Sequence, residues 1–314
     1  MTPPKISVVM SVYNGEKHLR EAVDSILNQT FTDFEFIIIN DGSTDKTKKI
    51  LESFSDPRIR LFHQENIGLT KSLNIGLKNS KGDFIARMDA DDISHPDRFY
   101  EQVAYLEQNH AIGLLGTQYA VIDDNGKDFG TVRNPIKNSE IKDILLVINT
   151  FCHGAVMFRK ELLHIVGYYR EKFLCAQDYD LWLRFAEHTE VSNLDSVLYK
   201  LRRSINSITR KKTSQQLANH LLTIELAKER IKNGSDSLEM IYMDRVDKEL
   251  HNRYKVSYSR IKQFKSVCYM GYCQESLKLG YLSNSLTFWL KSFLLNPDTS
   301  KLKLLKNIIL KTIT

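Results

Sequence analysis

Acidic side chains gather at three points of the chain where they could take part in catalysis or bind a metal. They are Asp41, the group Asp89, Asp91 and Asp92, and Asp178. The first two points directly follow the short apolar runs Phe34–Asn40 and Phe84–Met88. Such runs are typical of strands buried on both faces of a parallel sheet. Because ligands of these sheets bind beyond the carboxyl ends of the strands, we expect the carboxylates to lie at a binding site.

Asp89 and Asp91 form a D-x-D pair. On an extended segment, residues i and i+2 point the same way, so both carboxylates can face one ligand. Neighbouring carboxylates repel each other, and burying them costs free energy unless a cation compensates. Carboxylate oxygens suit Mg²⁺ or Mn²⁺, which also bind substrate diphosphates. A D-x-D pair alone is a common solvated turn, and the position after a buried strand is what favours a metal site here.

The elements that must position these residues alternate between strand and helix over the first 125 residues. We expect strands at 6–11, 34–40, 59–62, 83–88 and 112–122. Apolar stripes with helical spacing run through 19–27, 69–77 and 99–106, and Pro96 marks a helix start. This alternation predicts an α/β domain with a mostly parallel sheet flanked by helices.

The second half of the chain is less regular. Helix signals lie at 139–149, 160–166 and 177–188, and from about residue 211 onward the chain is polar and helical. We therefore predict one domain at 1–205 and a helical C-terminal region at 206–314. Residues 201–314 carry 21 Lys and Arg against 9 Asp and Glu, whereas the first 200 residues carry 23 against 29. The basic end suits an anionic membrane surface or lipid diphosphate, or is a solvated helical surface.

Cysteine usage and hydropathy point to the cytoplasm. No pair of the four cysteines has C-x-x-C spacing, so reduced, mostly buried thiols are expected. The N-terminal apolar run resembles a first strand more than a signal peptide, and no stretch of 18 apolar residues occurs. For the tail 301–314, peripheral contact with the inner face of the plasma membrane and helix packing remain alternatives.

Four segments together resemble the nucleotide-sugar glycosyltransferases of family 2, which have the GT-A fold. They are Ser7–Gly15, Ile39–Asp45, Gly82–Asp92 and Gln177–Trp182. Their order and spacing match as well, and the resemblance covers roughly residues 4–205. It implies an inverting, metal-dependent transfer of a hexosyl group from a nucleotide-diphosphate sugar, typically UDP-linked, to a hydroxyl of a saccharide or lipid-linked acceptor. The setting it implies is surface polysaccharide or lipid-linked oligosaccharide assembly.

The resemblance also implies roles on the donor side. Ser11 and Tyr13 would line the nucleotide pocket, and Asp41 would accept a hydrogen bond from the base. Asp89 would hold the ribose or assist the metal. Asp91 would bind the Mn²⁺ or Mg²⁺ that bridges the donor diphosphate.

On the acceptor side, Asp178 matches the catalytic base of the family, which deprotonates the attacking hydroxyl. A carboxylate in this role contributes about 10²–10⁴-fold to the rate. The residue before the base is commonly Glu in the family, and here it is Gln177. This departure concerns a position next to the acceptor, so it bears on acceptor identity more than on the chemistry.

Five further basic residues have functional or structural interpretations. His153 suits a third metal ligand or a diphosphate contact, or is a structural histidine. Lys71, at an expected helix start, meets phosphate charge or is solvated. Arg202 and Arg203 belong to a basic loop near the diphosphate or to the surface. Arg98 is expected to pair with acidic neighbours for structural reasons.

Rival functions lack their sequence signatures. A dinucleotide-binding oxidoreductase needs G-x-G-x-x-G after the first strand, and a nucleotidyltransferase needs a glycine-rich basic loop there. The turn Tyr13–Lys17 has one glycine. No nucleic-acid-binding motif is present. The remaining alternative is a catalytically silent nucleotide-sugar-binding or assembly subunit of the same fold, which the intact D-x-D and base disfavour.

Overall fold

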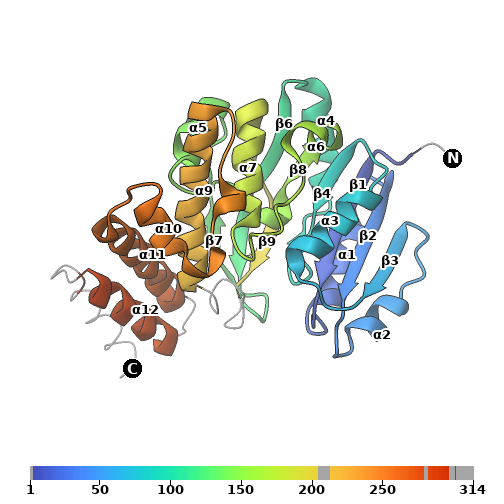
Figure 1. Ribbon diagram of the computed structural model, residues 1–314. Coiled ribbons are helices and arrows are strands. Elements are labelled where there is room, and N and C mark those ends of the chain that lie inside the picture. The colour runs from blue at the N-terminus through green and yellow to red at the C-terminus, as the bar shows by residue number, and fades with distance from the viewer. Residues whose placement is uncertain (1–2, 204–212, 279–281, 297–300, 302–314) are drawn as a thin grey trace. The chain divides into compact units, whose positions relative to one another are not determined.

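The computed structural model describes residues 3–203, 213–278, 282–296 and 301. The chain divides into two compact units, 1–203 and 204–314 (Figure 1). Of the tail 301–314, residues 302–314 lie outside the described residues, so its two interpretations stay predictions.

The N-terminal unit is built on one nine-stranded sheet. Its strands are β1 (Ile6–Val12), β2 (Phe34–Asp41), β3 (Ile59–Gln64), β4 (Phe84–Arg87), β5 (Ile93–Ser94), β6 (Ile112–Ile122), β7 (Asp128–Val132), β8 (Met157–Arg159) and β9 (Glu190–Arg202). Their spatial order is β3-β2-β1-β4-β8-β6-β9-β5, and β7 pairs with β6. Strands β1 to β4 are mutually parallel where they pair, as are β6 and β9, while β8 runs antiparallel to both of its neighbours. The predicted mostly parallel sheet is confirmed.

Helices cover both faces of the sheet. They are α1 (Leu19–Leu27), α2 (Thr47–Glu52), α3 (Leu69–Asn79), α4 (Arg98–Gln108), α5 (Asn138–Leu145), α6 (Leu163–Val166) and α7 (Gln177–His188), with the 3₁₀ turns η1 (His153–Ala155) and η2 (Lys160–Leu162). The apolar stripes of α1 and α4 pack with the side chains of Ile6, Val8 and Met10 in one core. Since successive strand residues point to opposite faces, Val9 meets α3 on the other face.

Helix α3 approaches the sheet very closely at Gly76. A Cβ built on this glycine would lie 2.5 Å from Cγ1 of Val9. A larger residue would therefore push α3 away from β1. This close approach holds the second half of α3 against β1, while the start of α3 is tied to the end of β2 by the hydrogen bond from the amide of Gly68 to Asp41.

Some strands and helices were not predicted from the sequence. The long strand β9 falls in the stretch predicted as irregular, because its burial does not follow a simple alternation and it pairs with β6 across register shifts. The short strands β5, β7 and β8 and the helix α2 were also missed. The helix expected at 139–149 ends at Leu145.

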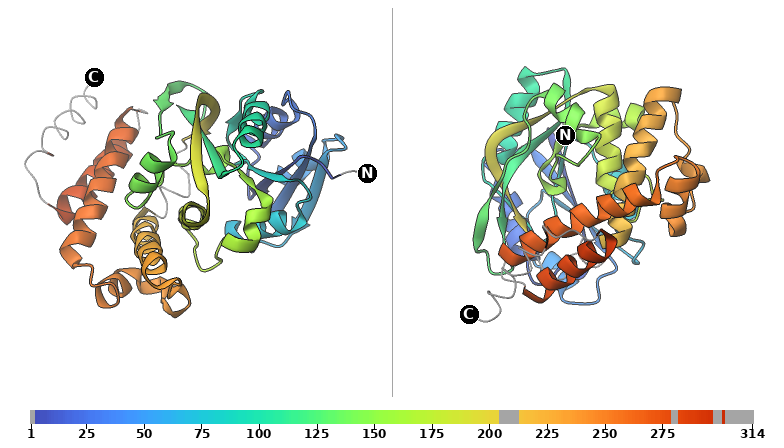
Figure 2. Two further views of the ribbon diagram at one scale, coloured as in Figure 1. Left: turned by 90° about the horizontal axis from the view of Figure 1, so that it is seen from above. Right: turned by 90° about the vertical axis from the view of Figure 1, so that its left-hand side faces the viewer.

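The C-terminal unit is helical, as predicted. It contains α9 (Thr213–Asn233), α10 (Val246–Asn252), α11 (Tyr258–Lys278) and α12 (Leu282–Leu295), with the 3₁₀ turns η3 (Leu238–Met240) and η4 (Met243–Arg245). Helices α11 and α12 pack against each other (Figure 2). The apolar core of this unit includes Leu217, Tyr269 and Trp289. Within the described ranges, no helix is both long and apolar enough to cross a membrane.

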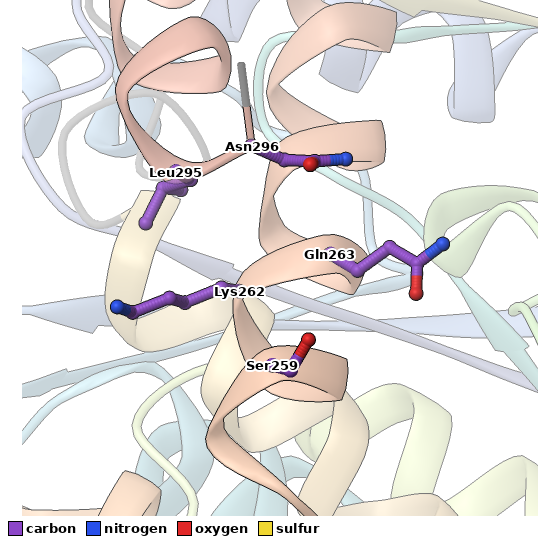
Figure 3. A pocket seen from close by; sticks show the side chains of 5 residues that line it. All are labelled: Ser259, Lys262, Gln263, Leu295 and Asn296. Carbon is purple, nitrogen blue, oxygen red and sulfur yellow. The ribbon is translucent and has the colours of Figure 1, made fainter. Parts of the chain in front are cut away.

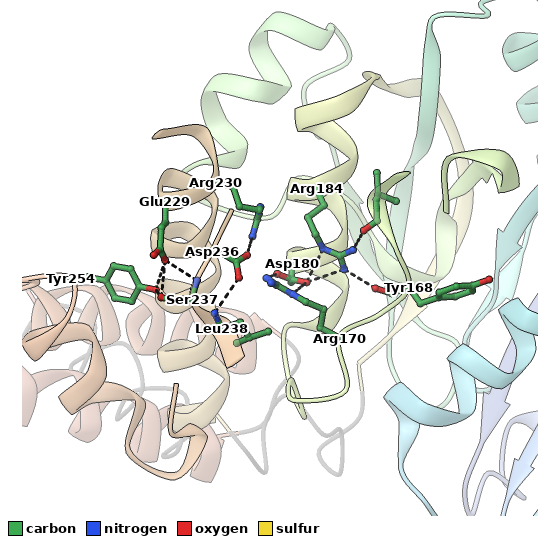
Figure 4. A network of polar contacts seen from close by, with 11 residues as sticks. Tyr168, Arg170, Asp180, Arg184, Glu229, Arg230, Asp236, Ser237, Leu238 and Tyr254 are labelled. Carbon is green, nitrogen blue, oxygen red and sulfur yellow. Dashed lines mark hydrogen bonds and ion pairs between the residues drawn. The ribbon is translucent and has the colours of Figure 1, made fainter. Parts of the chain in front are cut away.

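Two polar features mark this unit. Glu229 accepts hydrogen bonds from Ser237 and Tyr254, which ties the end of α9 to the loops that follow it (Figure 4). A hollow of about 450 Å³ lies between α11 and the end of α12 (Figure 3). Its lining is Ser259, Lys262, Gln263, Leu295 and Asn296. No residue of the predicted site belongs to it, since all of those lie in the N-terminal unit.

Candidate active site

Asp41 ends β2 with a carboxylate that is only 2% exposed and is surrounded by donors. Its Oδ1 accepts from Nε2 of Gln64 at 2.8 Å and from the amide of Ile67 at 2.9 Å, and its Oδ2 accepts from the amide of Gly68 at 2.9 Å. Gly68 precedes α3 and has φ of +92°, a conformation that glycine adopts without strain. The carboxylate therefore ties β2 and β3 to the positive end of α3.

The loops that follow β1 and β2 interlock. The amide of Asn14 donates to Oγ of Ser43 at 3.0 Å, and the amide of Thr44 donates to Oδ1 of Asn14 at 2.8 Å. Asn14 has φ of +51°, which Asn tolerates better than most residues. At this edge Ser11 is nearly buried, whereas the ring of Tyr13 is 52% exposed. Tyr13 is thus available for stacking on a ligand.

The D-x-D segment crowds three carboxylates after β4. Nη2 of the buried Arg87 donates to Oδ1 of Asp89 at 2.6 Å. Burial and the negative charge of Asp89 raise the pKa of Asp91 to about 6, and burial raises the pKa of Asp92 well above its ordinary value. Arg202 steadies the segment, since its Nε donates to the carbonyl of Asp91 and its amide donates to Oδ1 of Asp92, both at 2.7 Å.

This donor set fits a divalent cation. Among the described residues, no Lys or Arg forms an ion pair with the Asp91 carboxylate, and no three His, Cys, Asp or Glu side chains converge as a ready-made metal cage. Mg²⁺ and similar ions are commonly held by one or two carboxylates together with substrate phosphates and water. Asp91 and Asp89 supply such a pair, and a cation there would relieve their mutual repulsion.

His153 lies in the turn η1, against the side chains of three buried residues. Nε of Arg87 donates to its Nε2 at 3.3 Å, and the hydroxyl of Tyr169 lies 2.9 Å from the same nitrogen. The ring of Trp182 meets the imidazole edge to face at 6.1 Å between centroids. Burial and the charge of Arg87 lower the pKa of His153 to about 3, so the imidazole is neutral at physiological pH.

Asp178 lies in the first turn of α7. The helix begins after Ala176, whose φ of +61° is uncommon for a residue with a Cβ. Nδ2 of Asn149 donates to Oδ2 of Asp178 at 3.1 Å. Burial raises the pKa of Asp178 to about 6, while the amides of Asp178 and Tyr179 favour the charged form and the charge of Asp89 opposes it. A carboxyl with this pKa is largely ionised at pH 7 and able to accept a proton.

A buried ion-pair network holds the start of α7 in place. Asp180 pairs with Arg170 and with Arg184, whose Nη2 lies 3.0 Å from Oδ2 of Asp180 (Figure 4). Arg184 also donates to the carbonyls of Val166 and Tyr168. Asp180 was predicted to mark the helix start; it lies in the first turn, and its carboxylate binds arginines.

Comparisons with known proteins agree with this architecture. A model of glycosyl transferase family 2 matches residues 7–166. The chain belongs to glycosyl transferase family 2. EpsE of Bacillus subtilis, named as a glycosyltransferase, is 35% identical over 230 residues, which span 71% of this chain and 81% of EpsE. AmsE of Erwinia amylovora, named as an amylovoran biosynthesis glycosyltransferase, is 32% identical over 212 residues, or 66% of this chain and 79% of AmsE.

Solved structures show the same fold at low sequence identity. TarS of S. aureus, crystallised with UDP-GlcNAc, aligns with a TM-score of 0.62 at 18% identity over 92% of this chain and 91% of the TarS chain. The mannosyltransferase PcManGT of Pyrobaculum calidifontis, in complex with GDP-Man and Mn²⁺, aligns with a TM-score of 0.55 at 15% identity over 100% of this chain and 87% of that chain. The predicted GT-A-like fold is thereby confirmed.

In this family 2 chain, two arginines differ from their predicted roles. Arg202 is buried, and its guanidinium binds the carbonyls of Asp91 and Asp123 and the carboxylate of Glu21. It is neither surface charge nor available to a diphosphate. Arg98 is structural as expected, but its Nη1 and Nη2 donate to the backbone carbonyls of Gly154 and Arg87 and not to acids.

Three other predictions have simple outcomes in the structure. Lys71 is exposed in the first turn of α3, where both of its interpretations remain open. Asp45 accepts the amide of Thr47 at the start of α2, as expected of a helix-start residue. Cys152, Cys175 and Cys273 are buried cysteines that form no disulfide with one another.

Arg87, Asn149 and Tyr169 were missed from the sequence. Arg87 carried a signal, because a charged residue inside the apolar run Phe84–Met88 has to find a buried partner. Asn149 and Tyr169 carried none. Their contacts join segments that lie 29 and 16 residues apart in the chain.

Proposed function

We propose that this glycosyltransferase transfers a hexosyl group, with inversion, from a UDP-linked sugar to a hydroxyl acceptor. The observation that carries the proposal is a chain of contacts from the D-x-D pair to the helix of the catalytic base. Arg87 donates to Oδ1 of Asp89 and to Nε2 of His153, whose ring meets Trp182 on α7, four residues after Asp178. These contacts support the proposal that the D-x-D pair and the catalytic base serve one site.

The chain supplies each part that this chemistry needs. Asp178, oriented by Asn149, accepts the proton of the acceptor hydroxyl as that oxygen attacks the anomeric carbon. Attack on the face opposite the leaving diphosphate inverts that carbon. Ser11 and Tyr13 would contact the nucleotide. Asp41, at the carboxyl end of β2, would accept a hydrogen bond from the nucleobase. A divalent ion held by Asp91 and Asp89 would supply charge stabilisation for the leaving diphosphate.

The donor nucleotide is proposed on two grounds. Exposed Tyr13, after β1, offers a stacking surface, and Oδ2 of Asp41, at the end of the neighbouring β2, accepts the amide of Gly68 and keeps capacity for one more hydrogen bond. TarS binds UDP and UDP-GlcNAc, whereas PcManGT binds GDP-Man, so the fold accommodates both nucleotides. We favour UDP because the resemblance in the D-x-D and Asp41 segments points to uracil.

Exposed aliphatic side chains near the catalytic base Asp178 support an acceptor with an apolar part. Ile144, Val147 and Ile148 are all exposed, and they directly precede Asn149, which binds Asp178. Three exposed aliphatic side chains within five residues form an uncommon surface for a polar substrate alone. A lipid-linked saccharide would contact them with its apolar end while presenting a hydroxyl to Asp178.

The setting we propose is polysaccharide or lipid-linked oligosaccharide assembly on the cytoplasmic side of a membrane. The named role of AmsE in amylovoran biosynthesis supports the pathway class. The buried thiols of Cys152 and Cys273, which form no disulfide in the described region, support a reducing compartment.

Thermal unfolding with nucleotides tests the donor site. The wild type, Asp91→Ala and the surface control Asp33→Ala would be heated with UDP or GDP, each with Mn²⁺, Mg²⁺ or EDTA. A nucleotide at 100 times its Kd adds about 2.7 kcal/mol, which raises the Tm by about 2–4 °C or more at this size. We expect a UDP shift that requires metal, persists in Asp33→Ala and disappears in Asp91→Ala. The absence of any shift at saturating nucleotide would contradict the proposal.

A binding shift without turnover would favour the silent-subunit alternative. Release of UDP from UDP-hexoses, with saccharide, lipid-linked saccharide or water as acceptor, separates the two functions. We expect turnover with at least one UDP-hexose.

A further inference from the structure

The ring nitrogen Nε2 of His153 is occupied from two sides. Nε of Arg87 lies 3.3 Å away and donates to it, and the hydroxyl of Tyr169 lies 2.9 Å away. A guanidinium has only donors, so the nitrogen facing it must be an acceptor. The hydroxyl of Tyr169, which can rotate, then donates to the same lone pair. Nε2 of His153 therefore carries no hydrogen.

The remaining proton of the neutral ring must lie on Nδ1. A protonated imidazole would point an N–H at the N–H of Arg87. Burial, together with the charge of Arg87, lowers the pKa of His153 to about 3. Nδ1 has no hydrogen-bond partner in the described part of the chain, yet it is not among the polar atoms sealed from solvent there. It is thus a donor with a fixed direction that an incoming ligand can reach.

The surroundings of His153 join the two halves of the site. Arg87, which donates to Nε2, also donates to Oδ1 of Asp89 at 2.6 Å. On the other side, the imidazole meets the ring of Trp182, which lies one helical turn after Asp178 on α7. The transferred sugar has to lie between the D-x-D pair, which serves the diphosphate, and the base, which serves the acceptor. His153 is positioned along that span.

We propose that His153 is a hydrogen-bond donor to the transferred sugar, with Nδ1–H fixed toward the substrate by Arg87 and Tyr169. A divalent ion would need an unprotonated ring nitrogen. Since Nε2 is taken and Nδ1 carries the proton, the donor role replaces the metal-ligand role, which was one of the alternatives that the sequence left open. Arg87 acts as a positioning residue, because one guanidinium sets both the Asp89 carboxylate and the tautomer of His153.

The tautomer can be measured on the unliganded protein. Nitrogen-15 NMR of histidine-labelled wild type, with the His153→Gln variant to assign the signal, reports which ring nitrogen carries hydrogen. We expect a neutral Nδ1–H ring that does not titrate between pH 5 and pH 8. An Nε2–H tautomer, or a titration within that range, would overturn the proposal. The role toward the sugar rests on the proposed function, whereas this tautomer does not.

Two amide substitutions separate donor from ligand. In His153→Asn the side-chain amide reaches the position of Nδ1 and can still donate there, whereas in His153→Gln it reaches the position of Nε2. We expect His153→Gln to lower kcat/KM for the UDP-sugar by about 3–10-fold, the range for one hydrogen bond, and His153→Asn to retain more activity. Both variants should bind UDP as the wild type does, with an unchanged Mn²⁺ requirement.

Calorimetric titration of UDP and Mn²⁺ distinguishes the sugar contact from a metal-ligand role and from a diphosphate contact. A tenfold rise in the Mn²⁺ concentration needed for UDP binding in both variants would show a metal ligand and overturn the donor role. Equal losses of UDP affinity and UDP-sugar affinity would place the contact on the diphosphate and overturn the assignment to the sugar. If UDP failed to bind the wild type at all, the proposed function would fail while the NMR result would still stand.

Discussion

The loops after β2 and β4 lie on either side of β1, and each presents a carboxylate that the protein treats differently. Asp41 receives three hydrogen bonds, two of them from backbone amides that precede α3. Asp91 has no cationic side-chain partner among the described residues, and its pKa is raised to about 6. The first carboxylate is compensated by the fold, and the second is not.

This difference distinguishes a carboxylate whose charge the fold compensates from one whose charge it leaves uncompensated. Amide donors stabilise the Asp41 anion and connect three elements at the same time. At Asp91, burial and the nearby Asp89 disfavour the negative charge. The free-energy cost of ionising Asp91 is therefore not offset unless a cation binds. We propose that a bound cation would offset this cost, and the raised pKa values of Asp91 and Asp92 are consistent with that proposal.

The largest expected effect comes from replacing the proposed catalytic base, Asp178, which would act together with both carboxylate loops. Asp178→Asn should lower kcat by about 10²–10⁴-fold, because the amide cannot accept the hydroxyl proton. Binding of the UDP-sugar should change little, since Asp178 lies on the acceptor side. Turnover measured as UDP release, and affinity measured by calorimetry, give the two values. Asp33→Asn, a change at an exposed carboxylate, serves as control; a loss of affinity with normal kcat would contradict the assignment.

The comparison itself is tested by neutralising each carboxylate. Asp41→Asn should lower the free energy of unfolding by about 1–3 kcal/mol, because its amide group would face buried donors that lose their acceptor. Asp91→Asn should leave the free energy of unfolding unchanged or raise it, since it removes a repelled charge. Denaturant unfolding of both variants without nucleotide provides the measurement. Equal destabilisation would mean that the two loops are alike.

The pH dependence should follow Asp178. Its pKa of about 6 implies that kcat/KM falls tenfold per pH unit below that value and levels off above it. In Asn149→Ala the carboxylate loses a donor that favours its charged form, so the acid limb should move to higher pH. A limb that stays in place would mean that another group sets the profile.

The raised pKa of Asp178 also affects the stability of the fold, which should fall as pH rises whereas activity should increase. The folded protein binds this proton more readily than the unfolded chain, whose carboxyl has the ordinary value of 3.8. The stability contribution of Asp178 is therefore present at low pH and is lost as pH rises from about 4 to about 6. Asp178→Asn should flatten unfolding curves in that window, which thermal unfolding across pH values measures.

The smallest expected effect concerns the apolar residues before Asn149. Val147→Ser together with Ile148→Ser should raise the KM several-fold for an acceptor with a long alkyl chain, because each buried CH₂ contributes about 0.8 kcal/mol. The KM for a short-chain analogue of the same saccharide should stay constant. Rates with an alkyl glycoside and with its methyl glycoside make the comparison, and parallel changes for both would exclude an apolar contact.

Donor-side elements could largely be predicted from the sequence. The runs at β1, β2 and β4 are buried along their whole length, and α1, α3 and α4 follow their apolar stripes. Local pattern suffices there because each strand is sealed between two helical layers and must be apolar throughout. The carboxylates that end these strands follow from the same pattern.

The acceptor half depends more on tertiary structure. Strand β8 has only three residues, and β9 pairs with β6 through several register shifts, so neither has a strong local pattern. Arg202 illustrates the same limit. It is basic and near the end of the unit, as a surface residue would be, but the fold turns it inward against Asp91 and Glu21.

The sequence by itself determined the family, the α/β class and the carboxylates that carry the proposed chemistry, because these depend on residue type and on spacing along single elements. Tertiary structure decided how those groups are tuned. The raised pKa of Asp178, its contact with Asn149 and the tautomer of His153 arise where segments distant in the chain meet. Burial and hydrogen-bond partners set these properties, and neither exists until the sheet and its helices have packed.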